Sequence, residues 1–338
     1  MWQEPARGGY PEWELVGLSG HDFMQSFLER RGPVPPIGHL MGVLPTVIGH
    51  GHATFTMPSS RWFLSPPGFI QGGALAVLAD GALGCAVHTA LPPATPYTTS
   101  EISMTFIRPV TEDSGTLTAE GRLIHAGRSM GLSEVSVTDG GDRLVAHGTS
   151  RCFVFDPMSP APEPPSSLPP LEPPVYDTPD PYLRPVEGDT LPPSIWNERT
   201  GLDILRECID RELPAPPIYY LTGMRPVDAG DGTTTFVMPA TEWLNNPLAR
   251  VHGGTIAWLA DSALSSAAQT IVPAGMTYVT VDLKVNFLRP VSADGRDLTA
   301  YGKVVHRGRT LAIANAEVVN AEGKKVAFGT GTIMLRKA

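Results

Sequence analysis

The alternation of apolar and polar residues predicts one series of elements that occurs twice along the chain. In the first half, β-branched or alternating residues favour strands over residues 98–107, 115–126, 129–138 and 144–155. Ahead of them, residues 74–87 are apolar almost all round, which is typical of a buried helix. One buried helix and about five antiparallel strands predict an α+β unit in which the sheet wraps around a central helix.

The two series are related by a fixed offset of 181 residues. Residues 20–153 align with residues 201–334 without an insertion or a deletion. Near the start of the first copy, an amphipathic helix is expected over residues 22–30, followed by short strands near residues 42–47 and 54–57. Solenoid repeats are only ~20 to 50 residues long, so a period of this length indicates duplicated domains.

The 338 residues divide accordingly into two predicted domains, residues 1–155 and residues 200–338, with a linker over residues 156–199. The linker is rich in proline, which lacks a backbone amide donor and favours extended segments. We therefore expect a semi-rigid tether, long enough to let the two halves pack side by side.

Each half opens its buried helix with a Gly-Gly pair and carries an aspartate eight residues after the first glycine. The first copy reads QGGALAVLAD and ends at Asp80, and the second reads HGGTIAWLAD and ends at Asp261. Eight residues span about 12 Å of helix, so the glycines and the acid of one helix cannot contact one small group. If the two helices lie antiparallel across a pseudo-twofold axis, Asp80 lies beside Gly253 and Asp261 beside Gly72. Two composite sites are therefore predicted.

The second half contains Asn246, the triplet His252-Gly253-Gly254, Asp261 and Thr280 at a characteristic spacing. This pattern resembles the hotdog-fold acyl-CoA thioesterases, in the branch that contains the phenylacetate-pathway and 4-hydroxybenzoyl-CoA thioesterases. The resemblance covers nearly all of both halves. It implies two tandem hotdog domains packed as a pseudo-twofold double hotdog, and an enzyme that hydrolyses acyl-CoA to a free acid and CoA.

The resemblance also implies what accompanies the enzyme. Coenzyme A is part of the substrate, so no separate cofactor is expected, and two double-hotdog chains could associate as a homodimer. A metal at His50-Gly-His52 is disfavoured, because the counterpart in the second copy is Asp231-Gly-Thr233.

The chemistry of the groups fits this activity. Backbone amides at a helix start lack intrahelical acceptors and lie at the positive end of the helix dipole, so Gly253 can stabilise the oxyanion that forms from a thioester carbonyl. A desolvated Asp80 is a stronger base than a free aspartate, and can either activate water or attack the carbonyl directly. The family pattern further implies that Asn246 orients the carbonyl or the water, that Thr99 holds the water or the acid, and that His252 fixes the loop.

Structural alternatives exist for each of these residues. A buried aspartate can serve helix packing, a glycine can allow close packing, and Asn246 can be a turn residue ahead of Pro247. The first copy has Ser65 and Gln71 where the second has Asn246 and His252. The site that contains Asp80 is thus expected to be complete, and the site that contains Asp261 is expected to be altered. The residues expected to bind substrate are Gly254, Ser65, Gln71, Gly72, Gly73, Thr280, Arg250 and Arg309.

Composition narrows the remaining choices. The chain has 42% hydrophobic and 17% charged residues, no apolar run near the ~20 residues of a membrane span, and no apolar signal-peptide core at its start, so a cytoplasmic protein is expected. A net charge of −9 opposes nucleic-acid binding. Coenzyme A is a polyanion, and the candidates for contacting it are Arg250, Arg108, Arg289 and the turns that end in Arg128 and Arg309. Three unpaired cysteines indicate neither disulfides nor a zinc site.

Two other functions are weighed against thioester hydrolysis. A non-catalytic acyl-CoA sensor would keep the pocket and lose the base, which Asp80 and Asp261 argue against. For a hotdog enoyl-CoA hydratase, the resemblance implies an aspartate and a histidine about five residues apart. In this sequence His252 is followed by glycines and has no acid at that spacing. The sequence therefore favours an acyl-CoA thioesterase.

Overall fold

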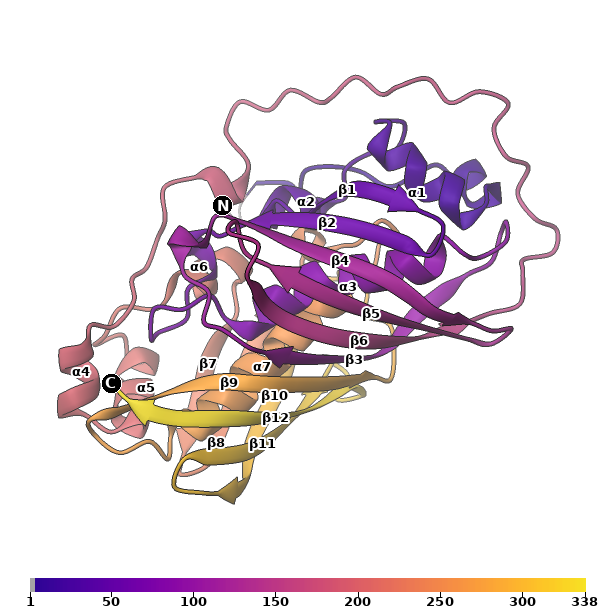
Figure 1. The fold of residues 1–338 in the computed structure, drawn as a ribbon. Coiled ribbons are helices and arrows are strands. Elements are labelled where there is room, and N and C mark those ends of the chain that lie inside the picture. The colour runs from indigo at the N-terminus through magenta and orange to yellow at the C-terminus, as the bar shows by residue number, and fades with distance from the viewer. Residues whose placement is uncertain (1–3) are drawn as a thin grey trace.

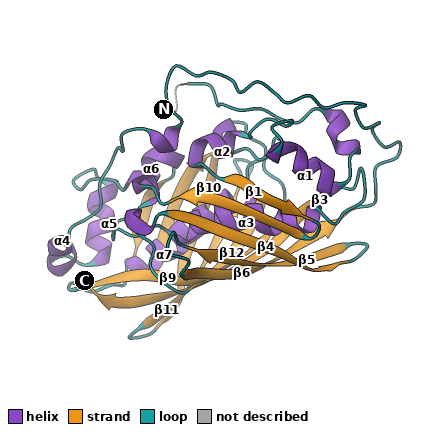
Figure 2. Cartoon of the chain, turned by 45° about the horizontal axis from the view of Figure 1, so that its top comes forward, coloured by secondary structure: helices purple, strands orange, loops and turns teal. Residues whose placement is uncertain are grey.

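The computed structural model describes residues 4–338 and contains two halves with the same order of elements (Figures 1 and 2). The first half comprises α1 (Gly20–Leu28), α2 (Pro36–Met41), β1 (Leu44–Gly49), β2 (His52–Pro58), α3 (Gly72–His88), β3 (Tyr97–Phe106), β4 (Thr116–Ala126), β5 (Met130–Thr138) and β6 (Leu144–Val154). The second half comprises α5 (Gly201–Ile209), α6 (Pro217–Thr222), β7 (Arg225–Gly230), β8 (Thr233–Pro239), α7 (Gly253–Gln269), β9 (Met276–Phe287), β10 (Asp297–Arg307), β11 (Leu311–Val319) and β12 (Lys325–Lys337).

The strands form one antiparallel sheet in the order β1-β2-β4-β5-β6-β3-β9-β12-β11-β10-β8-β7. The order reads symmetrically from the centre, where β3 of the first half pairs with β9 of the second and places Met104 opposite Leu283. Each half contributes six strands, which match the six strand segments expected along the first copy and agree with the round figure of about five. The short β1 or β7 lies at each edge of the sheet and pairs only with β2 or β8.

The helix before β1 was not predicted from the sequence. Residues 36–41 form α2, and β1 begins two residues later than expected, at Leu44. Pro36 occupies the first turn of α2, where its missing amide costs no intrahelical bond, and Gly42 ends the helix with a φ of 71°. A plain connection was expected between the helix over residues 22–30 and the strand near residue 42, but Pro35 and Pro36 begin a helical turn there.

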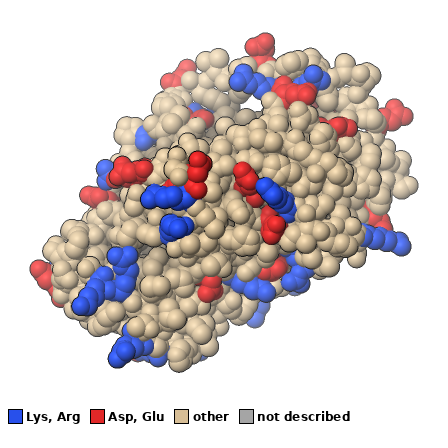
Figure 3. Space-filling model, viewed as in Figure 1, with Lys and Arg blue, Asp and Glu red and all other residues tan. Residues whose placement is uncertain are grey.

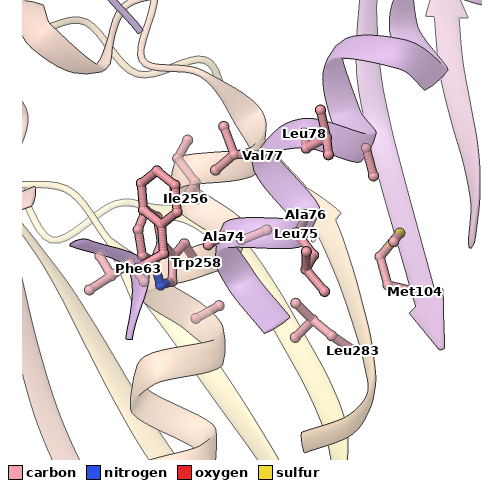
Figure 4. Packing of buried hydrophobic residues seen from close by; sticks show 14 of the residues in the cluster. Phe63, Ala74, Leu75, Ala76, Val77, Leu78, Met104, Ile256, Trp258 and Leu283 are labelled. Carbon is pink, nitrogen blue, oxygen red and sulfur yellow. The ribbon is translucent and has the colours of Figure 1, made fainter. Parts of the chain in front are cut away.

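Helices α3 and α7 lie on the concave side of the sheet and pack against each other at the centre of the molecule. Their glycines allow this close approach. A β-carbon at Gly73 would lie 2.5 Å from the Cα of Trp258, and one at Gly254 would lie 2.4 Å from the Cα of Val77. Figure 4 shows the apolar side chains of this region, with Trp258 and Phe63 close to the start of α3. The two helices are antiparallel, because the start of each contacts the middle of the other.

The segment that joins the two halves runs a long way over the surface, as Figure 1 shows. Much of it is extended, as its proline content predicts, but it also contains α4 (Pro193–Glu198) and a short 3₁₀ turn (Pro181–Leu183). It is attached to the first half, since Leu191 N–H donates to the carbonyl of Pro66 and the buried Arg7 forms an ion pair with Asp180. The linker therefore packs on the first half and is more than a flexible connection between the two halves.

Candidate active site

Asp80 lies in the middle of α3 and contacts the start of α7 from the other half. Its Oδ2 accepts a hydrogen bond of 2.9 Å from the amide of Gly254, and its Oδ1 accepts one of 3.1 Å from the hydroxyl of Thr99 on β3. Only 7% of the residue is exposed. Both carboxylate oxygens thus accept a hydrogen bond, one from a donor in the same half and one from a donor at the start of α7.

His252 precedes α7 and caps it. Its Nδ1 accepts a hydrogen bond of 3.1 Å from the amide of Gly254, and lies 3.4 Å from Oδ2 of Asp80. Burial lowers the pKa of His252, and the nearby Asp80 carboxylate opposes that shift in part. A neutral imidazole that accepts at Nδ1 carries its proton on Nε2, so this ring can act as a donor at Nε2.

Gly253 is the first residue of α7, and its amide has no acceptor within residues 4–338. A β-carbon at this position would lie 2.8 Å from Oδ2 of Asp80, so only glycine lets the acid approach the helix start without displacement. The dipole of α7 adds positive potential at the same point. An unpaired amide beside a carboxylate, at the end of a helix, can bind a carbonyl oxygen.

Asn246 lies on the loop before α7. Its Oδ1 accepts hydrogen bonds from the amides of Leu248 and Arg250, at 2.9 and 3.2 Å, and so shapes the loop as a turn residue does. The residue also lines the cavity beside Asp80. The structure therefore gives Asn246 the turn geometry that was the alternative interpretation, together with a place on the cavity wall.

A cavity of about 540 Å³ connects these groups. The predicted residues Asp80, Thr99, Asn246, His252, Gly253 and Arg250 all line it. Its remaining wall is mostly apolar and comes from α1, α2, β1, β2, α3 and the ends of β3 and β9. Five of the six residues predicted as catalytic thus share one cavity at the boundary between the two halves.

Asp261 is held in the same way at the symmetry-related position. Its Oδ2 accepts from the amide of Gly73 at 2.8 Å, and its Oδ1 accepts from the hydroxyl of Thr280 at 2.9 Å. It has no exposed surface, and it lines neither the cavity beside Asp80 nor a second, smaller cavity on its own side of the molecule. Desolvation raises the pKa of Asp261 to about 6, against the hydrogen bonds from Gly73, Thr280 and Gln71. The sixth residue predicted as catalytic is therefore enclosed.

Gln71 and Trp258 close off this second position. The amide oxygen of Gln71 accepts from the indole N–H of Trp258 at 2.9 Å, and its NH₂ group donates to Ser262 at 3.1 Å. A smaller cavity of about 210 Å³ lies outside them, and Ser65, Gln71, Gly72 and Thr280 line it. Trp258 is completely buried, which agrees with a role in core packing.

Three of the residues predicted to bind substrate lie elsewhere. Gly73 and Gly254 are pressed against the opposite helix, and their amides are taken by Asp261 and Asp80, so neither lines a cavity. Arg309 is exposed in a turn and lines neither cavity. In its place, Arg289 joins Arg250 at the larger cavity. Acidic and basic side chains are interspersed over the face that Figure 3 shows.

The apolar half of the larger cavity was not predicted from the sequence. Phe23 and Phe27 of α1, His88 of α3 and Tyr97 of β3 line it together. The signal for this wall lay in the mismatches between the two copies, because Phe27 aligns with Cys208 and His88 with Gln269. Such differences become meaningful only when the positions are known to face a cavity.

Among residues 4–338, no helix combines the length and the apolar character that a membrane span requires. The model of the thioesterase superfamily matches the chain twice, over residues 67–146 and 248–327. The acyl-coenzyme A thioesterase PaaI of Escherichia coli is 31% identical over 109 residues, which cover 32% of this chain and 75% of that protein.

Two solved structures share the arrangement of both halves. The tesB protein of Mycobacterium avium subsp. paratuberculosis matches with a TM-score of 0.55 at 14% identity, over 89% of this chain and 98% of that one. A hot dog fold protein from Alicyclobacillus acidocaldarius matches with a TM-score of 0.54 at 14% identity, over 90% of this chain and 99% of that one. The chain therefore belongs to the thioesterase superfamily, a family of thioester hydrolases, and carries two hotdog domains in tandem.

Proposed function

We propose that the protein hydrolyses acyl-CoA thioesters at a single composite site that combines Asp80 and Thr99 of the first half with Gly253, His252 and Asn246 of the second. The observation that carries the proposal is the meeting of a carboxylate and an unpaired helix-start amide in one cavity: Asp80 and Gly253 both line it. The likeness to an acyl-coenzyme A thioesterase supports the choice of CoA ester.

The thioester carbonyl oxygen binds at the amide of Gly253, which stabilises the negative charge that develops on it. A water molecule between the carbonyl carbon and Asp80 attacks that carbon while Asp80 accepts its proton. The tetrahedral intermediate then collapses, the carbon–sulfur bond breaks, and the CoA sulfur leaves as a thiolate. The thiolate takes up the proton that Asp80 accepted from water, which restores the carboxylate. The products are one carboxylic acid and one CoA thiol, so one water is consumed in each turnover.

Each neighbouring group has a defined part in this mechanism. The Thr99 hydroxyl and the Gly254 amide fix the orientation of the carboxylate through one hydrogen bond to each oxygen. Neutral His252 shares the Gly254 amide and keeps the start of α7 in register with the acid. Arg250 and Arg289 lie on the cavity wall and supply positive charge for the CoA phosphates.

The test compares Asp80→Asn with Asp261→Asn, by release of free CoA thiol from a panel of acyl-CoAs. An asparagine can keep both hydrogen bonds, since its oxygen accepts from the glycine amide and its NH₂ group donates to the threonine. Asp80→Asn is expected to reduce kcat about 10²- to 10⁴-fold, the usual contribution of a general base. Asp261→Asn is the matched control and is expected to leave kcat within about three-fold, because Asp261 is enclosed.

The remaining outcomes discriminate against the proposal. An equal loss of kcat in the two variants would mean that both sites hydrolyse substrate. Full activity in Asp80→Asn would remove the base from the mechanism. A wild type that binds acyl-CoA without releasing CoA from any ester would identify the protein as a binding module.

A further inference from the structure

The cavity beside Asp80 continues along α3, on the face that carries every fourth residue. Asp80, Gly84 and His88 are spaced by four residues, so they lie in a row on that face and all line the cavity. Two helical turns separate the first from the last, which is about 12 Å. The acid therefore stands at one end of a channel whose floor is α3.

The far end of the channel is built from aromatic rings. The ring of Phe23 lies 5.2 Å from that of Phe27 and 5.1 Å from that of His88, and His88 lies 4.8 Å from Tyr97, centroid to centroid. Burial lowers the pKa of His88 to about 4, so this ring is uncharged at neutral pH. The end of the channel thus offers an apolar surface and no charge.

The second half shows what closes the same space. Gly84 aligns with Ser265, and His88 aligns with Gln269. Gln269 is fully enclosed, where its NH₂ group donates to the carbonyl of Gly201 and its oxygen accepts from the hydroxyl of Tyr278. The smaller cavity reaches Ser265 and Tyr278 but no residue of α5, the counterpart of α1. Side chains on α7 therefore fill what is open along α3.

Gly84 lies on the channel wall between Asp80 and His88. A β-carbon there would lie 3.5 Å from the hydroxyl oxygen of Tyr97 and 3.9 Å from Oγ1 of Thr99, which are ordinary contact distances. A small side chain consequently fits the fold at this position. It would nonetheless project into the channel between the acid and the aromatic rings, because Gly84 lines the cavity.

We propose that the absence of a side chain at Gly84 opens an acyl channel from Asp80 to the rings of α1, and that residue 84 sets the length of the acyl group that this enzyme accepts. The substrate class is an acyl-CoA whose acyl group is apolar and long enough to reach those rings. This inference rests on the proposed function, since it assigns the reacting carbonyl to Asp80. Each buried methylene is worth roughly four-fold in affinity, so the channel gives a strong preference for longer chains.

The test measures kcat/KM for acetyl-, butyryl- and octanoyl-CoA in wild type, Gly84→Ala, Gly84→Leu and Ser265→Ala. The ratio of the octanoyl to the acetyl value is expected to fall several-fold in Gly84→Ala and by about 30-fold or more in Gly84→Leu. Ser265→Ala, on the matching face of α7, is the control and should leave the ratio unchanged. Alanine is the better helix former, so Gly84→Ala should melt no lower than wild type.

A ratio that stays constant in a folded Gly84→Ala and Gly84→Leu, or an equal loss for all three esters, would overturn the proposal. Binding of the non-hydrolysable thioethers S-ethyl-CoA and S-octyl-CoA, measured by calorimetry, separates it from the proposed function. If wild type releases no CoA, hydrolysis fails. If Gly84→Leu then lowers the affinity for S-octyl-CoA and not the affinity for S-ethyl-CoA, the channel is still supported. If it lowers the affinity for neither compound, the channel is refuted.

Discussion

The carboxylate of Asp80 accepts a hydrogen bond of 2.9 Å from the amide of Gly254, although 174 residues separate them in the chain. The symmetry-related pair, Asp261 and Gly73, is joined at 2.8 Å. Each acid thus holds the start of the helix in the other half, and the same contact that fixes the interface also places an acid next to a helix dipole. The pair that contains Asp80 opens on a cavity, and the pair that contains Asp261 does not.

Substitution by alanine should have different effects at Gly253 and at Gly254. Gly254→Ala places a β-carbon 2.4 Å from the backbone of Val77, so the helices must separate and stability should fall by about 1 to 3 kcal/mol. In Gly253→Ala the β-carbon would lie 2.8 Å from Oδ2 of Asp80 and at ordinary contact distance from the ring of Phe287, so kcat should fall sharply with little change in melting temperature. Urea unfolding and thiol release measure the two effects. Equal loss of stability in both variants would contradict this separation.

The enclosed Asp261 should make stability depend on pH. Its folded pKa of about 6 lies above the value of 3.8 for a free aspartate, so the folded state binds the proton more tightly than the unfolded state does. The protonated form stabilises the fold fully below pH ~4, and this contribution is lost as the pH rises through about 6. The difference between these two pKa values corresponds to roughly 3 kcal/mol of stability over the whole pH range.

Asp261→Asn isolates that effect from the other carboxyl groups. The difference in unfolding free energy between wild type and Asp261→Asn, taken from urea titrations, should fall by about 2 kcal/mol between pH 4 and pH 7. A difference that is the same at both pH values would show that Asp261 ionises as a free aspartate does.

Trp258 should be a main determinant of stability at the boundary of the halves. Its side chain is fully buried, its ring lies 6.3 Å from that of Phe63, and its N–H donates to Gln71. Trp258→Ala should cost about 3 to 5 kcal/mol, because the surrounding helices cannot fill the volume that the indole leaves. Denaturant unfolding checks this. A cost below about 1 kcal/mol would mean that the region collapses readily around the smaller residue.

The arginines of the larger cavity should contribute to CoA binding and not to the chemical step. Arg250→Ala is expected to raise KM for an acyl-CoA by about ten-fold with kcat nearly unchanged, since a hydrogen bond to a charged group is worth about 1.5 to 3 kcal/mol. Arg309→Ala is the control, because Arg309 lines neither cavity. An N-acetylcysteamine thioester of the same acid lacks the phosphates, so its KM should not change. A parallel rise for that ester would exclude phosphate recognition.

The elements of this fold were largely predictable from local pattern. The four long strands of the first half, β3 to β6, begin and end within one residue of their expected positions at nearly every boundary. The short α2 was not predicted, because it has only six residues and most of them are apolar. A run of this length and composition resembles the start of a strand. Edge strands such as β1 are equally ambiguous, since a run of six residues carries little periodicity.

The sequence by itself determined the duplication and the two buried helices. It also indicated that each acid needs the helix start of the other copy, because a glycine and an acid eight residues apart in one helix cannot meet, and the structure shows the antiparallel pairing that was the condition for this. Only the tertiary structure decided that the amide of Gly254, and not that of Gly253, binds the acid, that Trp258 and Gln71 enclose Asp261, and that a channel runs beside Gly84. These outcomes depend on which side chains fill the space between packed elements, and periodicity along one chain records which face is buried but not what lies against it.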